Sequence, residues 1–396
     1  MKKKLFALTM AMLMALNLAA CGGSDKPADD SGDAEPSTDA PAGSVFKLGT
    51  IGPLTGDYAI YGQAVAHGAQ IAVDEINAVG GEVQFQLQSE DDVGDGETSV
   101  NAYNKLMDDG MQVLVGPTTS GASIAVASKV FEDRTFMMTP SGSAPDINAG
   151  KDNVFQVCFT DPNQGTGAAD YIAEHMPDAK VSVLYQNDIA YSQGVRDTFV
   201  AEAAAKGLEV VHEATFTADS KSDFSVQLTA AQAAGTDLLF LPIYYQEASV
   251  VLNQADQMGY APTFFGVDGL DGILTLENFD IALAEGVMLL TPFSADAKDE
   301  RTQTFVKTYE EKYGETPNQF AADAYDAVYI VKAALEAAGC TPDMSATDVC
   351  EAMVSVMTTL SYDGLTGQGM TWAADGTVSK APMAVVIKDG VYVLPQ

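Results

Sequence analysis

The chain has 396 residues, of which 55 are acidic and 20 basic, so its formal net charge at pH 7 is −35. A protein that binds nucleic acid needs a basic face, and no cluster of Lys or Arg beyond the first four residues offers one, so we expect no nucleic-acid partner. The three histidines and four cysteines form no metal-binding or catalytic motif. We therefore expect no metal, no cofactor and no enzymatic activity.

Residues 1–20 have the features of an export signal. Lysines at positions 2–4 precede an apolar core at 5–16, and small residues lead up to Cys21. The block Leu-Ala-Ala-Cys at 18–21 resembles the lipobox of bacterial lipoproteins, which implies that Cys21 carries a lipid anchor; an ordinary signal cut near Ala20 is the alternative. Residues 21–44 are rich in Asp, Ser, Pro and Gly, which predicts a flexible tether.

Strands and helices alternate over residues 45–160. Apolar runs predict strands at 46–51, 83–88, 113–115, 136–138 and 154–159. Amphipathic runs predict helices at 62–79, 97–109 and after Ser120, with a further helix start at Pro145 and Asp146. This series of βαβ units predicts a doubly wound parallel sheet.

The same alternation starts again after residue 160. Helices are predicted at 164–176, 191–206, 224–234 and 246–258, and strands at 180–185, 209–216, 238–242, 263–266 and 286–290. Three helices then follow in a row, at 300–313, 319–338 and 346–359, before short strands at 384–387 and 391–394. The whole pattern predicts an α/β protein with two doubly wound parallel sheets.

Polar and aromatic side chains follow several of the predicted strands, and ligands of open α/β sheets bind beyond the carboxyl ends of strands. The loops at 116–120 and 139–143 would bring hydroxyl groups and free N–H groups of helix N-termini together, which suits a small carboxylate. Either loop by itself is equally compatible with a helix N-cap at Ser120 and an ordinary turn at 141–143. The candidates at strand ends are Tyr58, Tyr61, Ser120 and Ser143 in the first half and Tyr191, Tyr244 and Asp268 in the second.

Two of these loops match a known family. The segments GPTTSG (116–121) and TPSGSAPD (139–146) resemble the ligand-binding loops of the branched-chain amino acid binding proteins that serve ABC transporters. The resemblance implies that Ser120 and Ser143 hold the α-carboxylate of an amino acid and that Ser141 offers a backbone contact. It also implies that Asp268, which follows the strand at 263–266, pairs with the ammonium; a cap of the next helix is the alternative.

Three tyrosines resemble residues that pack on the ligand in this family. Tyr61 follows the segment GPLTG (52–56), Tyr191 precedes a glycine in the segment AYSQG (190–194), and Tyr244 follows the strand at 238–242. Each could equally lie at the edge of the core, because tyrosine is commonly half buried. Thr118 and Thr119 are more polar than a purely aliphatic pocket would need, and the stretch 154–161 lacks an arginine that family members often have.

The resemblance implies the type I periplasmic binding protein fold, in which the chain crosses three times between two lobes. We place the crossings near Thr160, Thr291 and Tyr362, which assigns 45–160 plus 292–362 to one lobe and 161–291 plus 363–396 to the other. The implied function is that of a monomeric, lipid-anchored extracytoplasmic protein that captures an amino acid, most commonly a branched-chain one, and delivers it to an ABC permease. The alternatives are the same fold binding an amide, urea or another small acid, and the sensing module of a receptor.

The remaining cysteines are interpreted from the compartment. Cys340 and Cys350 flank a short loop in an exported protein, so we expect a disulfide between them. Cys158 lies inside a predicted strand and is expected to be a buried free thiol.

Overall fold

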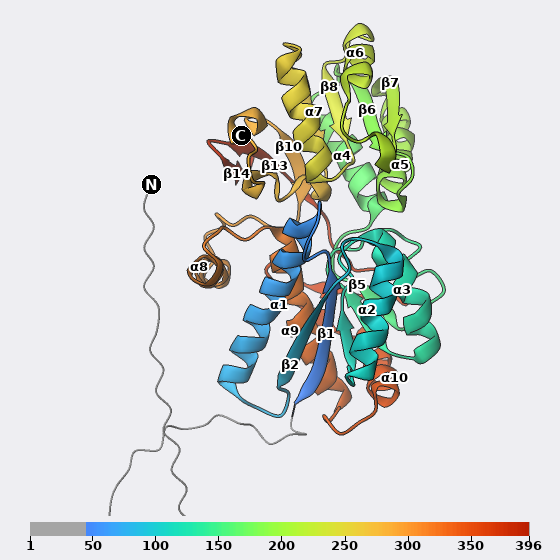
Figure 1. The fold of residues 1–396 in the computed structure, drawn as a ribbon, viewed down its shortest axis with the longest axis vertical. Helices are drawn as coiled ribbons and strands as arrows, with labels where there is room; N and C mark the ends of the chain where they lie inside the picture. The colour runs from blue at the N-terminus through green and yellow to red at the C-terminus, as the bar shows by residue number, and fades with distance from the viewer. Residues whose placement is uncertain (1–44, 396) are drawn as a thin grey trace, which may run out of the picture. The chain divides into compact units, whose positions relative to one another are not determined.

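The computed structural model describes residues 45–395. The predicted export signal, the tether and the lipidation site at Cys21 lie outside the described residues. Residues 45–395 form two α/β lobes, each built on its own main sheet (Figure 1). No helix in this range is long and apolar enough to cross a bilayer.

The first lobe contains an all-parallel sheet of five strands. Across the sheet they lie in the order β2 (Phe85–Asp91), β1 (Phe46–Gly52), β3 (Val113–Val115), β4 (Phe136–Thr139) and β5 (Val154–Gln156). The central strands β3 and β4 are short, mostly apolar runs that are fully buried, whereas the edge strand β2 alternates polar and apolar residues and is half exposed. This pattern is what a sheet covered by helices on both faces requires.

Six helices belong to this lobe: α1 (Ala59–Val79), α2 (Gly96–Asp108), α3 (Ser120–Asp133), α8 (Glu300–Tyr313), α9 (Gln319–Ala338) and α10 (Ala346–Met357). Helix α1 packs on α9, and α2 packs on α3. Thr119 caps α3, so Ser120 is the first residue of the helix. The helix start predicted at Pro145 and Asp146 is wrong: residues 145–150 form turns.

The second lobe contains a mixed sheet of seven strands. Across the sheet they lie in the order β14 (Val391–Val393), β13 (Met383–Lys388), β10 (Met288–Thr291), β9 (Thr263–Gly266), β8 (Leu238–Leu241), β6 (Lys180–Gln186) and β7 (Glu209–Phe216). Only β13 and β14 run antiparallel to their neighbours. The helices of this lobe are α4 (Asp161–His175), α5 (Ala190–Lys206), α6 (Ser225–Ala233) and α7 (Tyr245–Gln257), with short 3₁₀ turns η1 (Ala218–Ser220), η2 (Asp268–Leu270), η3 (Ile273–Thr275) and η4 (Ile281–Ala284).

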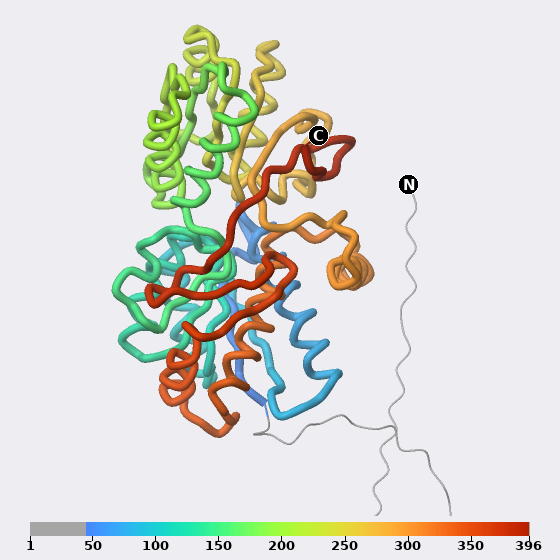
Figure 2. The backbone as a smooth tube through the Cα atoms, turned by 180° about the vertical axis from the view of Figure 1, so that it is seen from behind, coloured from blue at the N-terminus to red at the C-terminus, as the bar shows by residue number. Residues whose placement is uncertain are grey.

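The chain passes between the lobes after β5, after β10 and before β13. The predicted third crossing near Tyr362 is wrong. Residues 363–380 return along the first lobe. There Trp372 Nε1 donates to the backbone carbonyl of Gln156 at 2.9 Å, and the backbone N–H of Gln156 donates to the carbonyl of Gly376 at 3.0 Å. Figure 2 shows this segment running across the first lobe before it turns toward the second.

The physical reason lies in β5. It is an edge strand, whose unpaired backbone groups need partners, and the returning segment supplies them. The small ladder of β11 (Ser361–Tyr362) and β12 (Met370–Thr371) belongs to the same return. Residues 363–380 therefore extend the first lobe.

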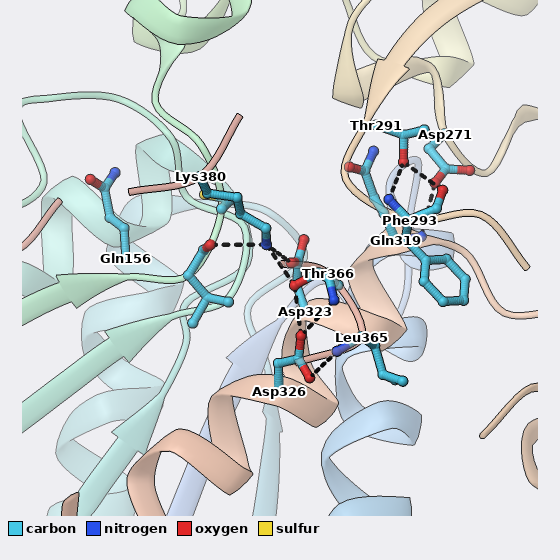
Figure 3. Close-up of polar contacts among 12 residues, drawn as sticks. Gln156, Asp271, Thr291, Phe293, Gln319, Asp323, Asp326, Leu365, Thr366 and Lys380 are labelled. Atoms are coloured by element: carbon cyan, nitrogen blue, oxygen red, sulfur yellow. Dashed lines mark hydrogen bonds and ion pairs between the residues drawn. The ribbon is translucent and has the colours of Figure 1, made fainter. Parts of the chain in front are cut away.

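A buried lysine ties this segment to the hinge. Lys380 Nζ lies 2.6 Å from Asp323 Oδ1 on α9 and donates to the carbonyl of Val157 on the first crossing at 3.1 Å (Figure 3). Asp326, one turn further along α9, accepts hydrogen bonds from the amides of residues 365 and 366. Because the ion pair is almost fully buried, removal of either partner would leave an uncompensated charge in the core.

The predicted disulfide between Cys340 and Cys350 is wrong, because both sulfurs are free. Cys350 lies on the buried face of α10, and Cys340 follows the C-cap of α9. Each packs into the apolar core, where burial raises the pKa of both thiols, that of Cys350 to about 12. An oxidising compartment and a short sequence spacing do not determine the directions of the two Cα–Cβ bonds, which must point toward each other for a disulfide to form. Cys340 and Cys350 do not form one here. Cys158 is buried as a free thiol.

The contact between α1 and α9 depends on a glycine. A Cβ built on Gly68 would lie 2.0 Å from the carbonyl oxygen of Ala321 on α9. We expect Gly68→Ala to push the two helices apart and lower the free energy of unfolding by about 3 kcal/mol, measured by urea denaturation. Gly121→Ala is the matched control, since a Cβ on Gly121 in α3 meets no atom within 4 Å. Equal stability of the two variants would contradict this packing.

Candidate functional site

The candidate site lies where loops from both sheets meet. In the first sheet the strand order reverses between β1 and β3, and in the second between β6 and β8. Ligands of doubly wound sheets bind at such switch points, beyond the carboxyl ends of the strands. The loops and helix starts that follow β1, β3 and β4 in one lobe and β6, β8 and β9 in the other carry most of the side chains of the site.

The first lobe contributes hydroxyl and amide groups. Ser120 Oγ accepts hydrogen bonds from the amides of Ser143 at 3.1 Å and Ala144 at 3.3 Å, so it joins the loops after β3 and β4. Ser141 Oγ donates to the carbonyl of Thr118 at 2.7 Å and fixes the second loop against the first. Ser120 opens α3, whose first N–H groups have no acceptor within the helix and carry a partial positive charge. This half of the site can therefore bind an anion without any Lys or Arg.

The second lobe contributes a carboxylate held by a tyrosine. Tyr191 OH donates to Asp268 Oδ1 at 2.7 Å and accepts from the amide of Gly269 at 3.0 Å. The amide of Asp268 donates to Gln164 Oε1 at 3.3 Å, which fixes the start of η2. Asp268 is 5% exposed, and burial raises its pKa to about 7. It has no salt bridge with a Lys or Arg of the described residues, so its charge has no compensating cation.

A second buried carboxyl lies beside the first. Asp161 begins α4, its amide donates to the carbonyl of Ser143 at 3.0 Å, and its side chain is fully buried. Neither carboxyl oxygen has a hydrogen-bond partner within residues 45–395. Burial raises the pKa of Asp161 well above its usual value; the Ser143 hydroxyl opposes the rise and the nearby Asp268 adds to it. Burial destabilises the ionised form of both acids, and Asp268, which lines the cavity, is therefore favourable for a cation.

Aromatic rings close the space between the two halves. Tyr191 and Tyr244 stack with their centroids 5.0 Å apart, and Tyr61 packs on Tyr244 and on Phe320 at 5.5 and 4.3 Å. Tyr61 OH donates to the carbonyl of Gly269 and accepts from the amide of residue 245, so this first-lobe side chain is hydrogen-bonded to the second lobe. The lobes are thus in contact across the site, in a closed arrangement.

Seven of the eight candidate residues line one small cavity. They are Tyr61, Ser120, Ser141, Ser143, Tyr191, Tyr244 and Asp268. The cavity also has Thr118, Thr119, Gly269 and Phe320 in its wall. Tyr58, the remaining candidate from the strand ends, lies outside this wall.

Sequence reasoning missed two residues next to this site. Phe320 lies on α9, far along the chain from the first-lobe loops, and no local pattern distinguishes it from a core phenylalanine. Asp161 follows β5 and precedes Pro162, which is typical of a helix start. The sequence did contain a signal for Asp161, because an acid a few residues after a buried strand is also the pattern that pointed to Asp268.

A wider groove of about 380 Å³ lies beside the second crossing, between η3, α8 and the turn before β14. Its wall contains the carboxylates of Asp271, Asp296, Glu310 and Glu315 but no Lys, Arg or His. It lacks the opposed donor and acceptor halves of the smaller cavity, and it would repel an anion. Within residues 45–395, no group of His, Cys, Asp and Glu side chains is arranged to hold a metal ion.

Comparison with known proteins agrees with this geometry. Residues 45–390 match a family described as periplasmic binding protein. The Leu/Ile/Val-binding protein BraC3 of Rhizobium johnstonii is 34% identical over 297 residues, which cover 74% of this chain and 79% of BraC3. Among solved structures, the leucine-binding protein LivK of Thermotoga maritima has a TM-score of 0.79 at 26% identity and covers 89% of this chain and 98% of its own.

The substrate-binding protein LivJ of Streptococcus pneumoniae, solved in complex with isoleucine, has a TM-score of 0.78 at 28% identity. The match covers 89% of this chain and 100% of that of LivJ. The predicted fold class, two α/β lobes of the periplasmic binding type, is therefore confirmed.

Proposed function

Because the chain belongs to the periplasmic binding protein family, whose members are extracytoplasmic and serve transporters rather than catalyse reactions, we propose that it captures a branched-chain amino acid between its lobes for an ABC permease. The observation that carries this proposal is the charge pattern of the closed cavity. Hydroxyl and amide donors from one lobe and the buried carboxyl group of Asp268 from the other line the same cavity. A zwitterion is complementary to both halves at once.

The carboxylate of the ligand would bind the first lobe. Ser120 and Ser143 offer hydroxyl groups, and the N-terminus of α3 offers amides. The ammonium would bind the second lobe, where it neutralises Asp268 beside Tyr191. Thr118 and Phe320, on the wall next to Tyr61 and Tyr244, are the surroundings left for the side chain.

This arrangement explains why a ligand would favour closure. Only the closed form brings the donors of the first lobe and the carboxyl group of Asp268 within reach of one small molecule. Charge-assisted hydrogen bonds contribute roughly 1.5 to 3 kcal/mol each. Three or four of them, less the cost of ordering, correspond to about −8 kcal/mol, which is an affinity near micromolar.

The proposal extends to the cellular setting. The lipobox-like block before Cys21 supports a lipid anchor at the mature N-terminus, with residues 22–44 as a tether between the anchor and the lobes. We propose that the protein acts as a monomer, since one chain supplies both halves of the cavity.

The experiment that tests the function is isothermal titration of residues 43–396, stripped of carried-over ligand, against the twenty amino acids, acetamide, urea and benzoate. We expect saturable heat from leucine, isoleucine or valine. Heat from an amide or from benzoate alone, with none from any amino acid, would reject the proposal.

The affinity for leucine should depend on pH through Asp268. Burial raises the pKa of this group to about 7 in the ligand-free protein, and an ammonium beside it would lower that pKa, so binding must displace a proton below pH 7. We expect a nearly constant Kd above about pH 8 and a rise of up to roughly tenfold per pH unit below pH 7. Titrations between pH 5 and pH 9 check this, and a Kd that is flat over this range would contradict the role of Asp268.

A further inference from the structure

A second set of polar contacts joins the lobes outside the ligand cavity. Asp57 and Tyr58 lie on the loop after β1 in the first lobe, and Lys221 and Glu247 lie after η1 and on α7 in the second. Lys221 Nζ is 2.7 Å from Asp57 Oδ2 and 3.3 Å from Glu247 Oε1. Tyr58 OH donates to Glu247 Oε1 at 2.9 Å. We call these four side chains the latch.

The acceptor at the centre of the latch is buried. Glu247 has a side chain only 1% exposed, and its Oε2 has no hydrogen-bond partner within residues 45–395. Lys221 supplies the neutralising charge, and its Nζ also lies 5.1 Å from the centroid of the Tyr58 ring. Because one oxygen of this buried carboxylate has no partner, each hydrogen bond to the other oxygen is expected to be stronger than one at an exposed surface. The Tyr58 hydroxyl should therefore contribute more to the free energy of closure than an exposed hydrogen bond would.

Three of the latch contacts exist only when the lobes are together. Tyr58 with Glu247, Asp57 with Lys221, and Tyr58 with Lys221 each join a first-lobe group to a second-lobe group. The N-terminus of α1 also depends on contact between the lobes. The backbone N–H of Ile60 donates to Tyr245 OH at 3.3 Å, and that hydroxyl donates to the carbonyl of Asp57 at 2.8 Å. Opening the lobes would break all of these bonds.

The latch is separate from the ligand. None of its four side chains lines the cavity that holds Asp268 and Ser120. Asp268 and Tyr61 are 5% and 1% exposed, so a ligand reaches them only when the lobes separate. Closure of the latch is therefore an event that can stabilise the bound state without a direct contact to the ligand.

We propose that Asp57, Tyr58, Lys221 and Glu247 are positioning residues that hold the lobes closed and thereby set the affinity and the residence time of the ligand. The observed affinity of a two-state protein is the intrinsic affinity multiplied by the fraction of the binding-competent state. A latch that favours the closed state raises that fraction for every ligand alike. The specificity for one ligand over another is then determined by the residues that line the cavity.

The test uses variants on the first-lobe side, which leave Lys221 and Glu247 paired within the second lobe. We expect Tyr58→Phe combined with Asp57→Asn to weaken leucine binding by roughly tenfold, with the change in the dissociation rate measured by stopped flow. The melting temperature of the ligand-free protein should stay close to that of the wild type. Relative affinities for leucine, isoleucine and valine should not change.

The matched control is Lys332→Met, which removes an ion pair to Glu336 within one helix of the first lobe. It should leave both affinity and dissociation rate unchanged. A double variant no weaker than this control would overturn the latch, as would a change in ligand preference without a change in residence time.

The choice of leucine as the probe rests on the proposed function, but the latch can be tested without it. A pair of fluorophores, one on each lobe, reports the distance between the lobes in the ligand-free protein. We expect the double variant to populate the open state more than wild type and Lys332→Met do. Identical distance distributions would reject the latch even if leucine binds, and a shift toward the open state would support it even if no amino acid binds.

Discussion

Asp268→Asn is expected to weaken leucine binding by about 100-fold or more, because truncating one partner of a buried charge pair costs roughly 2 to 5 kcal/mol. The amide keeps the shape of the side chain and can still accept from Tyr191, but it presents an N–H group where the ammonium would bind. Isothermal titration at pH 8, where the wild-type carboxylate is ionised, measures the loss.

The same variant should be more stable than wild type in the absence of ligand. The folded-state pKa of Asp268 is raised from 3.8 to about 7, so its ionisation removes stability as pH rises from about 4 toward 7. At pH 8 the penalty is on the order of 4 kcal/mol, part of which an uncharged amide recovers. We therefore expect Asp268→Asn to have a higher melting temperature than wild type and a lower affinity for leucine. This combination is typical of a residue that serves binding at the expense of stability.

Asp92→Asn provides the matched control. Asp92 is a fully buried acid of the first lobe whose pKa is also raised by burial, but its partners are Ser99 and the amide of Gly94, away from the cavity. Its replacement should leave leucine affinity unchanged. Equal losses of affinity in both variants would mean that the effect of Asp268 is structural rather than a contact with the ligand.

The second large effect is expected from Ser120→Ala. The variant removes the hydroxyl proposed to bind the ligand carboxylate and also the acceptor that joins the amides of Ser143 and Ala144 to the first loop. We expect affinity for leucine to fall by roughly 10- to 100-fold, since one charged hydrogen bond and the alignment of the two loops are lost together. Titration of leucine into the purified variant is the measurement.

Ser123→Ala is its control on the same helix. Ser123 is fully buried, its hydroxyl donates to the carbonyl of Pro117, and it does not line the cavity. It should lose some stability and keep its affinity. If Ser120→Ala binds leucine as tightly as Ser123→Ala does, the first lobe does not hold the carboxylate through this hydroxyl.

Much of the fold follows from local pattern. Strands β3 and β9 and helices α8 and α9 end where their apolar pattern ends, and their sequence-predicted bounds match the structure. Strand ends then locate the candidate site, because parallel strands deliver their following loops to one edge. That is why seven candidates found separately along the chain line one cavity.

The predictions that were wrong and the cavity residue that was missed all depend on long-range contacts. The segment 363–380 has no strong period of its own, and its path is set by the edge of β5, which lies about two hundred residues earlier in the chain. Cys340 and Cys350 are close in sequence, yet each follows its own helix into the core. Phe320 reaches the cavity only because the chain returns to the first lobe after β10.

The most direct test of the central claim compares leucine with two analogues that each lack one charge. Titration of the wild-type protein at pH 8 with leucine, with 4-methylpentanoate and with leucinamide asks whether both halves of the cavity are used. We predict binding of leucine and a loss of at least about 100-fold for each analogue, because each leaves one buried half of the site without its partner. Binding of 4-methylpentanoate as tight as that of leucine would contradict the account, since Asp268 would then have no ammonium to hold.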